Sequence, residues 1–91
     1  MKRLLWGRAA RRDLARLAAF YNTILPGLGD ELRLRAEDVP DILLEFPQIG
    51  SPTSRRGVRK WNIRRTPFQL FYTVVGEDVQ IRRVAHNRAD K

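Results

Sequence analysis

The fold is decided by residues 66–86, which read TPFQLFYTVVGEDVQIRRVAH. Residues 68–75 are almost all β-branched or aromatic, the composition typical of a β-strand. Gly76-Glu77 follows this run, and a Gly-X pair between two strand-like runs is typical of a two-residue type II′ hairpin. The apolar positions of the second run are Val79, Ile81 and Val84, with His86 at its end. The stretch therefore predicts two antiparallel strands joined by a tight turn in which Gly76 has a positive φ.

Residues 8–46, upstream of this hairpin, change to a helical period. Apolar residues recur every three or four positions in two stripes. Pro26-Gly27 separates the stripes, because proline cannot continue a helix and glycine tolerates the turn. Pro40 should kink or split the second helix near residues 37–39. We expect the two helices to form an antiparallel hairpin that packs across one sheet face through Leu14, Leu17, Tyr21, Leu32, Val39, Leu43 and Phe46.

Two further strands complete the predicted sheet. Residues 2–6 form a short strand that ends at Gly7, and residues 58–63 alternate polar with apolar side chains. Between the helices and the second of these strands lies a loop over residues 47–54, rich in proline, glycine and serine. The predicted order is β-α-α-β-β-β within a single domain, 1–91. The fold class is α+β, a two-layer sandwich with the helical hairpin packed on a mainly antiparallel sheet.

Composition excludes several kinds of site. The chain has no cysteine and one histidine, so disulfides, thiolate zinc sites and iron–sulfur clusters are excluded, and we expect no metal and no cofactor. Its apolar runs are far shorter than the roughly 20 residues of a membrane span, and residues 1–8 form no signal-peptide core. We therefore expect a cytoplasmic protein with no membrane partner. Its 18 basic and 10 acidic residues give a net charge of +8, which favours an anionic partner over a merely solvated basic face.

Four segments of the chain resemble the RelE/ParE superfamily of bacterial toxins from type II toxin–antitoxin modules. Residues 6–14 (WGRAARRDL) are similar to its opening strand, turn and "A-x-x-D-L" helix start. Residues 46–50 (FPQIG) match its "F-P-x-x-G", and residues 57–61 (GVRKW) its "G-x-R-x-hydrophobic". Residues 66–90 resemble its "P-[YF]-x-[IL]-x-Y … V-x-I-x-R-V-x-H-x-x-R-D" ending. The segments span nearly the whole chain in order.

The branch of the superfamily decides the chemistry. RelE-like toxins cut messenger RNA on the ribosome, which needs a group to deprotonate the 2′-hydroxyl, cations for the phosphorane and an acid for the leaving oxygen. RelE-like toxins fill these roles with about five catalytic residues, and the resemblance places Lys60 and Arg88 at two of those positions. Asn62 and Gln69 occupy two other positions, where the resemblance predicts cations. The resemblance therefore favours the ParE-like branch, whose members inhibit DNA gyrase and serve in plasmid stabilization. The alternatives are a ribonuclease acting through Lys60, Arg64 and Arg88, and a non-toxic chain that only binds antitoxin.

The basic residues of the strand regions are the candidate partner-binding and target-binding residues. They crowd around residues 55–65 and recur on the last strand: Arg55, Arg56, Arg59, Lys60, Trp61, Arg64, Arg82, Arg83, His86 and Arg88. His86 is expected to have a structural role at the sheet edge, with a catalytic role as the alternative. The aromatic residues are expected to fill the core rather than stack on bases. Asp13, the one acidic residue of the first helix, is expected to pair with the arginines beside it.

The implied partner is a cognate antitoxin in a hetero-oligomer. We expect it to bind with an amphipathic helix or an added strand, with acidic residues facing Arg59, Arg64, Arg82 and Arg83. The target is DNA gyrase, or the ribosome and its messenger RNA in the alternative. Contact with DNA is expected only through the antitoxin.

Overall fold

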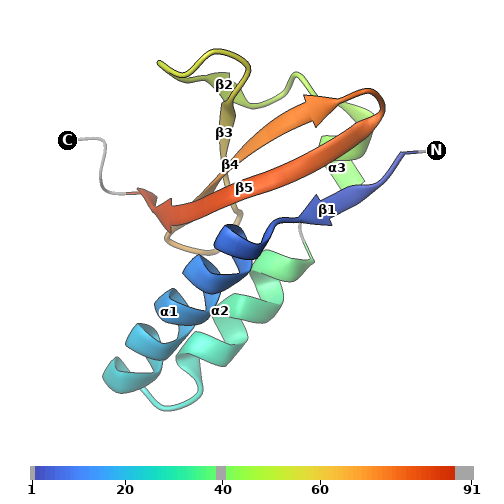
Figure 1. Ribbon diagram of the computed structural model, residues 1–91. Coiled ribbons are helices and arrows are strands. Elements are labelled where there is room, and N and C mark those ends of the chain that lie inside the picture. The colour runs from blue at the N-terminus through green and yellow to red at the C-terminus, as the bar shows by residue number, and fades with distance from the viewer. Residues whose placement is uncertain (1, 39–40, 88–91) are drawn as a thin grey trace.

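A computed structural model of the chain describes residues 2–38 and 41–87 and shows one sheet beside a helical hairpin (Figure 1). The elements are, in order, β1 (Leu4–Trp6), α1 (Arg8–Ile24), α2 (Leu28–Glu37), α3 (Asp41–Glu45), β2 (Ser51–Pro52), β3 (Arg59–Asn62), β4 (Phe68–Val75) and β5 (Asp78–His86). The strand order is β1-β5-β4-β3-β2. β1 runs parallel to β5, and every other pair is antiparallel. The predicted α+β architecture is therefore confirmed.

One local feature differs from the sequence prediction, and another agrees with it. The loop over residues 47–54 contains the two-residue strand β2, which pairs Ser51 with Lys60 and Pro52 with Arg59. Proline is compatible with this place because an edge strand need not use its amide as a ladder donor. The second helical stripe is divided into α2 and α3, and α2 ends at Glu37 as the position of Pro40 predicts.

The β4–β5 hairpin has the predicted turn and one irregularity. Val75 pairs with Asp78 across Gly76-Glu77, and Gly76 has φ 61° while Glu77 does not have a positive φ. These angles fit a type II′ turn. Farther along, Tyr72 pairs with Ile81 but Phe71 pairs with Arg83, so Arg82 is an extra residue in β5. This β-bulge explains why the buried positions of β5 are two residues apart at first and then three.

Close packing holds α1 against α2. A Cβ atom on Gly29 would lie 1.8 Å from the carbonyl oxygen of Ala18, so only glycine permits this helix contact. Asn22 fixes the start of α2, because its Oδ1 accepts hydrogen bonds from the backbone N–H of Gly29 at 2.7 Å and of Asp30 at 3.3 Å. The side chain of one helix thus caps the next.

The core lies between the helices and one face of β3, β4 and β5. Leu14, Leu32 and Leu43 are buried in it as predicted. Leu17 and Tyr21 are partly buried against it, and the predicted core residue Val39 lies outside the described residues. The core also takes in the buried side chains of Ile63, Phe68, Leu70, Tyr72, Val79, Ile81 and Val84.

The prediction that Phe46 belongs to the core is wrong. Its side chain is 59% exposed, because α3 ends at Glu45 and the helical period does not extend past it. Ile24 and Leu25, at the end of the first apolar stripe, are also exposed. At about 1.5 Å per residue α1 is roughly 25 Å long, and its last turn projects beyond the sheet (Figure 1).

Strand alternation gives the sheet a core face and an open face. Trp61 pairs with Leu70 on the core face, and Tyr72, two residues after Leu70, lies on the same face. Their neighbours alternate to the other side, so Lys60 and Phe71 pair on the face directed away from the core. We call this second side the open face.

Candidate functional site

A hollow on the open face lies where β4 and β5 meet the loop that precedes β3. Its volume is about 950 Å³. We call it the arginine cavity, because four of its lining residues are arginines and none is acidic. Its lining consists of Ala9, Thr53, Ser54, Arg55, Arg56, Val58, Phe71, Thr73, Arg82, Arg83, Val84 and Ala85.

The loop over residues 53–58 presents two of these arginines in a fixed shape. The Thr53 hydroxyl donates to the carbonyl oxygen of Val58 at 2.9 Å and accepts from the backbone N–H of Arg55 at 3.1 Å. The backbone N–H of Val58 donates to the carbonyl of Arg55 at 3.1 Å. Gly57 closes the turn with φ 79°, in the left-handed region that glycine favours. Arg55 and Arg56 are exposed on this ordered loop.

The β-bulge supplies the other two arginines. It leaves Arg82 and Arg83 both exposed between two buried residues of β5, and bulges commonly redirect side chains in this way. Arg83 donates from Nε and Nη2 to the two carboxylate oxygens of Asp13 at 2.7 and 3.0 Å. The expected pairing of Asp13 with arginines of its own helix is therefore corrected. Its carboxylate instead joins α1 to β5.

Asp13 has a pKa below its ordinary value. Burial acts to raise this pKa, but hydrogen bonds from the Arg83 guanidinium and from the backbone N–H of Val84, together with the positive charge, outweigh burial. The pKa of Arg83 is raised by the same bonds. The pair therefore stays charged at neutral pH, and Asp13 offsets the charge of one of the four cavity arginines.

A hydroxyl without a partner lies in the wall of the arginine cavity. The Oγ1 atom of Thr73 is buried, and no described group is hydrogen-bonded to it. Buried polar atoms are nearly always paired in folded proteins, so such an exception calls for an explanation. Phe71, two residues earlier on the same face, is the single aromatic residue of the lining. Sequence reasoning did not select Thr73 or Phe71 as site residues, although strand alternation places them together.

Two of the predicted binding residues have structural roles in this chain. Arg59 lies on the core side of β3 and donates from Nη1 to the carbonyl oxygen of Gly50 at 2.6 Å, with a longer contact of 3.3 Å to that of Gln48. It therefore holds the loop before β2. Trp61 packs partly buried against the core. A partner-binding role for either residue stays a prediction.

His86 has the expected structural surroundings. Its Nε2 is hydrogen-bonded to the Tyr21 hydroxyl at 2.5 Å, and the two rings stack with centroids 6.1 Å apart. The contact joins the end of β5 to α1.

The structure places two of the three candidate ribonuclease residues. Lys60 lies on the open face, whereas Arg64 is exposed beyond the end of β3. Arg88 lies outside the described residues.

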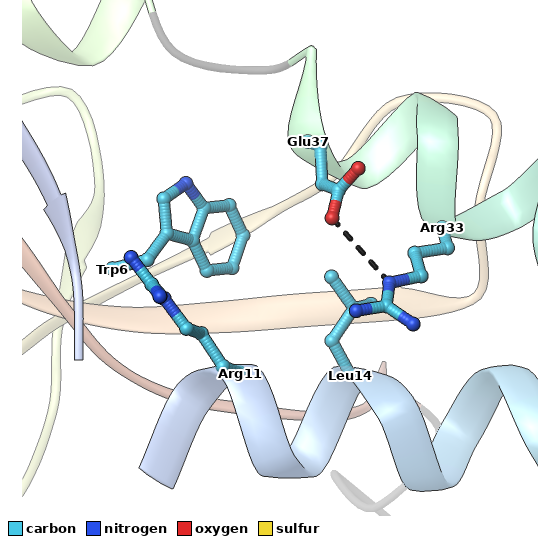
Figure 2. Close-up of a pocket in the computed structure, with 5 residues that line it drawn as sticks. All are labelled: Trp6, Arg11, Leu14, Arg33 and Glu37. Carbon is cyan, nitrogen blue, oxygen red and sulfur yellow. Dashed lines mark hydrogen bonds and ion pairs between the residues drawn. The ribbon is translucent and has the colours of Figure 1, made fainter. Parts of the chain in front are cut away.

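A second, smaller cavity of about 360 Å³ lies between β1 and the helical hairpin (Figure 2). Its floor is apolar, formed by Trp6 and the buried Leu14. Figure 2 shows Arg11 beside the indole and the Arg33–Glu37 ion pair across from it, joined at 3.4 Å. We call this the tryptophan cleft. No residue lines both it and the arginine cavity.

Neither cavity has the ligands of a metal centre. Within residues 2–38 and 41–87, no group of three or more histidine, cysteine or acidic side chains is arranged to hold a metal ion. In the same part of the chain, no helix has the length and apolar character needed to cross a membrane.

Comparison with known proteins identifies the family. No curated protein matches the chain. The chain is similar to the chromosomal ParDE toxin–antitoxin system of P. aeruginosa, with a TM-score of 0.78, 25% identity and coverage of 94% of this chain and 96% of that one. It shares the fold of the isolated E. coli RelE toxin, with a TM-score of 0.55, 17% identity and coverage of 91% of this chain and 81% of that one. It also shares the fold of the E. coli RelBE toxin–antitoxin complex, with a TM-score of 0.56, 17% identity and coverage of 91% of this chain and 93% of that one. The model of the ParE toxin of the type II toxin–antitoxin system parDE matches residues 4–91. The chain therefore belongs to the ParE toxin family of type II toxin–antitoxin systems.

Proposed function

We propose that this toxin inhibits DNA gyrase by binding it, and that it does not cut RNA. The observation that carries the proposal is the composition of the open face. Asn62 lies opposite Gln69 in register, and Gln69 is only 4% exposed. Both are neutral amides at positions where the resemblance to RelE-like ribonucleases predicts cations.

The missing cations bear directly on the chemistry. A preorganised charged or hydrogen-bonding group that stabilises developing charge contributes about 10²–10³-fold to a catalysed rate. A buried amide cannot replace the positive charge that a phosphorane requires. Lys60 remains on the open face, and this residue is the specific observation in favour of the alternative, a ribosome-dependent ribonuclease.

Two assays on the purified full-length chain separate these functions. We expect the chain to inhibit gyrase supercoiling with increasing dose and to leave messenger RNA intact in a cell-free translation reaction. RNA cleavage that disappears in Lys60→Ala would contradict the proposal and establish the ribonuclease. A chain that is inactive in both assays yet binds its antitoxin would establish the non-toxic alternative.

A cognate antitoxin is the second proposed partner. The tryptophan cleft has an apolar floor and a charged rim, which suits the apolar anchors of an amphipathic helix. β1 is an edge strand of the sheet, so its unpaired side is available for an added strand. In this proposal antitoxin and gyrase meet the toxin in the cytoplasm, and DNA contacts are made by the antitoxin.

Hydrogen–deuterium exchange of the toxin with and without its antitoxin tests this placement. We expect the antitoxin to slow exchange in β1 and in the parts of α1 and α2 that line the tryptophan cleft. Protection confined to β3 and β4 would contradict it. Arg59 holds a loop and Arg83 is paired with Asp13, so charge reversal of either residue would disturb the fold as well as the binding of a partner.

A further inference from the structure

We infer that the arginine cavity is a receptor for an acidic peptide segment of the toxin's target protein, with the Thr73 hydroxyl donating a hydrogen bond to a seated carboxylate. This inference rests on the proposed function for the identity of the protein that carries the segment. The chemistry of the ligand rests on the cavity alone.

Charge makes the cavity a site for an anion. Arg55, Arg56 and Arg82 form no ion pair with any described acidic side chain, and the lining contains no acidic residue. Arg83 is held by Asp13 through its Nε and one Nη2 hydrogen, so its other N–H groups stay available in a fixed orientation. Guanidinium groups bind carboxylates with two parallel hydrogen bonds.

The unpaired hydroxyl gives a second reason. Thr73 Oγ1 is buried in the cavity wall without a partner among the described residues. A hydroxyl can donate to a carboxylate oxygen, so a carboxylate that displaces the side chains covering this atom as it binds would satisfy it. The neighbouring Phe71 and Val58 give the floor apolar surface for the methylene groups of a glutamate or aspartate side chain.

Preorganisation gives a third reason. The loop of Arg55 and Arg56 is fixed by the Thr53 hydroxyl and by Gly57, and Arg82 is placed by the β-bulge. A site whose groups are already ordered loses less entropy when it binds. The bulge and the ordered loop thus bring together cations from two distant parts of the chain.

Protein is favoured over single-stranded nucleic acid as the ligand. Sequence-tolerant binding of nucleic acid strands uses aromatic rings on which bases stack. Trp6, Trp61, Phe68 and Tyr72 all pack in or against the core, and Phe71 is the one ring of the cavity lining. The cavity therefore offers charge and hydroxyls but lacks a stacking platform.

A transient target is favoured over the permanently bound antitoxin as the source of the segment. Long-lived interfaces are the more hydrophobic ones, and the apolar floor of Trp6 and Leu14 lies in the other cavity. A cluster of four arginines instead directs encounter and register more than it adds affinity.

Binding of peptides to the full-length chain tests the ligand chemistry. The probes are a blocked hexaglutamate peptide, the matched hexaglutamine peptide and hexathymidylate, followed by amide chemical shifts and by titration calorimetry at low salt. We expect hexaglutamate to shift the amides of Phe71, Thr73 and Arg82 and hexaglutamine to leave them unchanged. Tighter binding of hexathymidylate at the same amides would overturn the choice of protein over nucleic acid.

Variants test the residues that we assign to the site. We expect Arg82→Gln to weaken hexaglutamate binding about tenfold, which is the loss of about 1.4 kcal/mol. The matched control is Arg12→Gln, an equal charge change at an exposed position of α1 that does not line the cavity. Equal weakening by both variants would show non-specific charge attraction and overturn the site. Thr73→Val, nearly isosteric, should weaken binding several-fold with an unchanged or higher melting temperature, and unchanged binding would overturn the role of the hydroxyl.

The supercoiling assay on the same variants separates this inference from the proposed function. If gyrase is the target, Arg82→Gln should inhibit it less than Arg12→Gln does. Hexaglutamate binding without any inhibition of gyrase would overturn the proposed target and leave the cavity chemistry standing. Full inhibition of gyrase by Arg82→Gln would overturn the docking of the target in this cavity.

Discussion

Tyr72→Phe removes one oxygen atom from the centre of the fold. Tyr72 is 0% exposed, and its hydroxyl makes two hydrogen bonds that join β4 to the loop before β2. It accepts from the backbone N–H of Gly50 at 2.9 Å and donates to the carbonyl oxygen of Pro47 at 2.8 Å. A Cβ atom on Gly50 would lie 2.6 Å from this oxygen, so the contact occupies space that only glycine leaves open.

The magnitude follows from the two groups that lose a partner. A buried donor left unpaired costs about 1–3 kcal/mol, and this applies in full to the N–H of Gly50, which is buried. Pro47 is only partly buried, so water can reach its carbonyl, and we assign that loss about 0.5–1.5 kcal/mol. The sum is roughly 1.5–4.5 kcal/mol. For a chain of this size each kcal/mol lowers the melting temperature by about 4–8 °C.

Urea denaturation followed by circular dichroism measures the loss, and hydrogen exchange at Gly50 locates it. We expect a lower midpoint, an unchanged slope and faster exchange of the Gly50 amide. Tyr21→Phe is the matched control, since it removes a partly buried hydroxyl with a single described partner, His86, and should cost less. An unchanged midpoint together with a protected Gly50 amide would refute the reasoning.

Three further predictions concern stability. Gly29→Ala should lower the unfolding free energy by at least about 2–3 kcal/mol, because the new Cβ meets the carbonyl of Ala18; an unchanged melting temperature would contradict this. The pKa of Asp13 is lowered in the folded chain. The free energy of unfolding that wild type has in excess of Asp13→Asn should therefore be largest above about pH 4 and should decrease as the pH falls through the pKa of the folded state. Urea titration of both proteins at each pH measures this difference. Leu43→Ala should cost about 2–5 kcal/mol, whereas Phe46→Ala should cost less than about 1 kcal/mol, which paired thermal melts would show.

The elements with a clear period could be predicted from the sequence. The run over residues 68–75 is predicted as a strand and forms one, and Gly76 has the predicted positive φ. The stripe through Leu14 and Leu32 identifies the packed side of the helical hairpin. Such patterns are local, because burial repeats at the period of the element itself. Phe46 shows the limit of the method, since the period continues in the sequence after the helix has ended.

The spacing of buried residues in β5 carried a signal that sequence reasoning did not use. Val79 and Ile81 are two residues apart, Ile81 and Val84 are three apart, and all three are buried. A strand with strict alternation cannot bury both members of a pair three residues apart. The irregular spacing therefore indicates a β-bulge at Arg82 or Arg83, and the bulge places both arginines at the open face.

Charge partners depend on the tertiary fold, which is why the candidate site was only partly predictable. The basic cluster over residues 55–65 looks uniform in the sequence, yet its members have different surroundings in the structure. Arg59 bonds to backbone carbonyls of a loop, while Arg55 and Arg56 line the arginine cavity. The partner of Arg83 is seventy residues away at Asp13, a contact that no local pattern encodes. Charge reversals chosen from the sequence alone would therefore include Arg59, where they would disturb the loop. No pattern in the sequence points to Thr73, whose buried hydroxyl has no partner among the described residues.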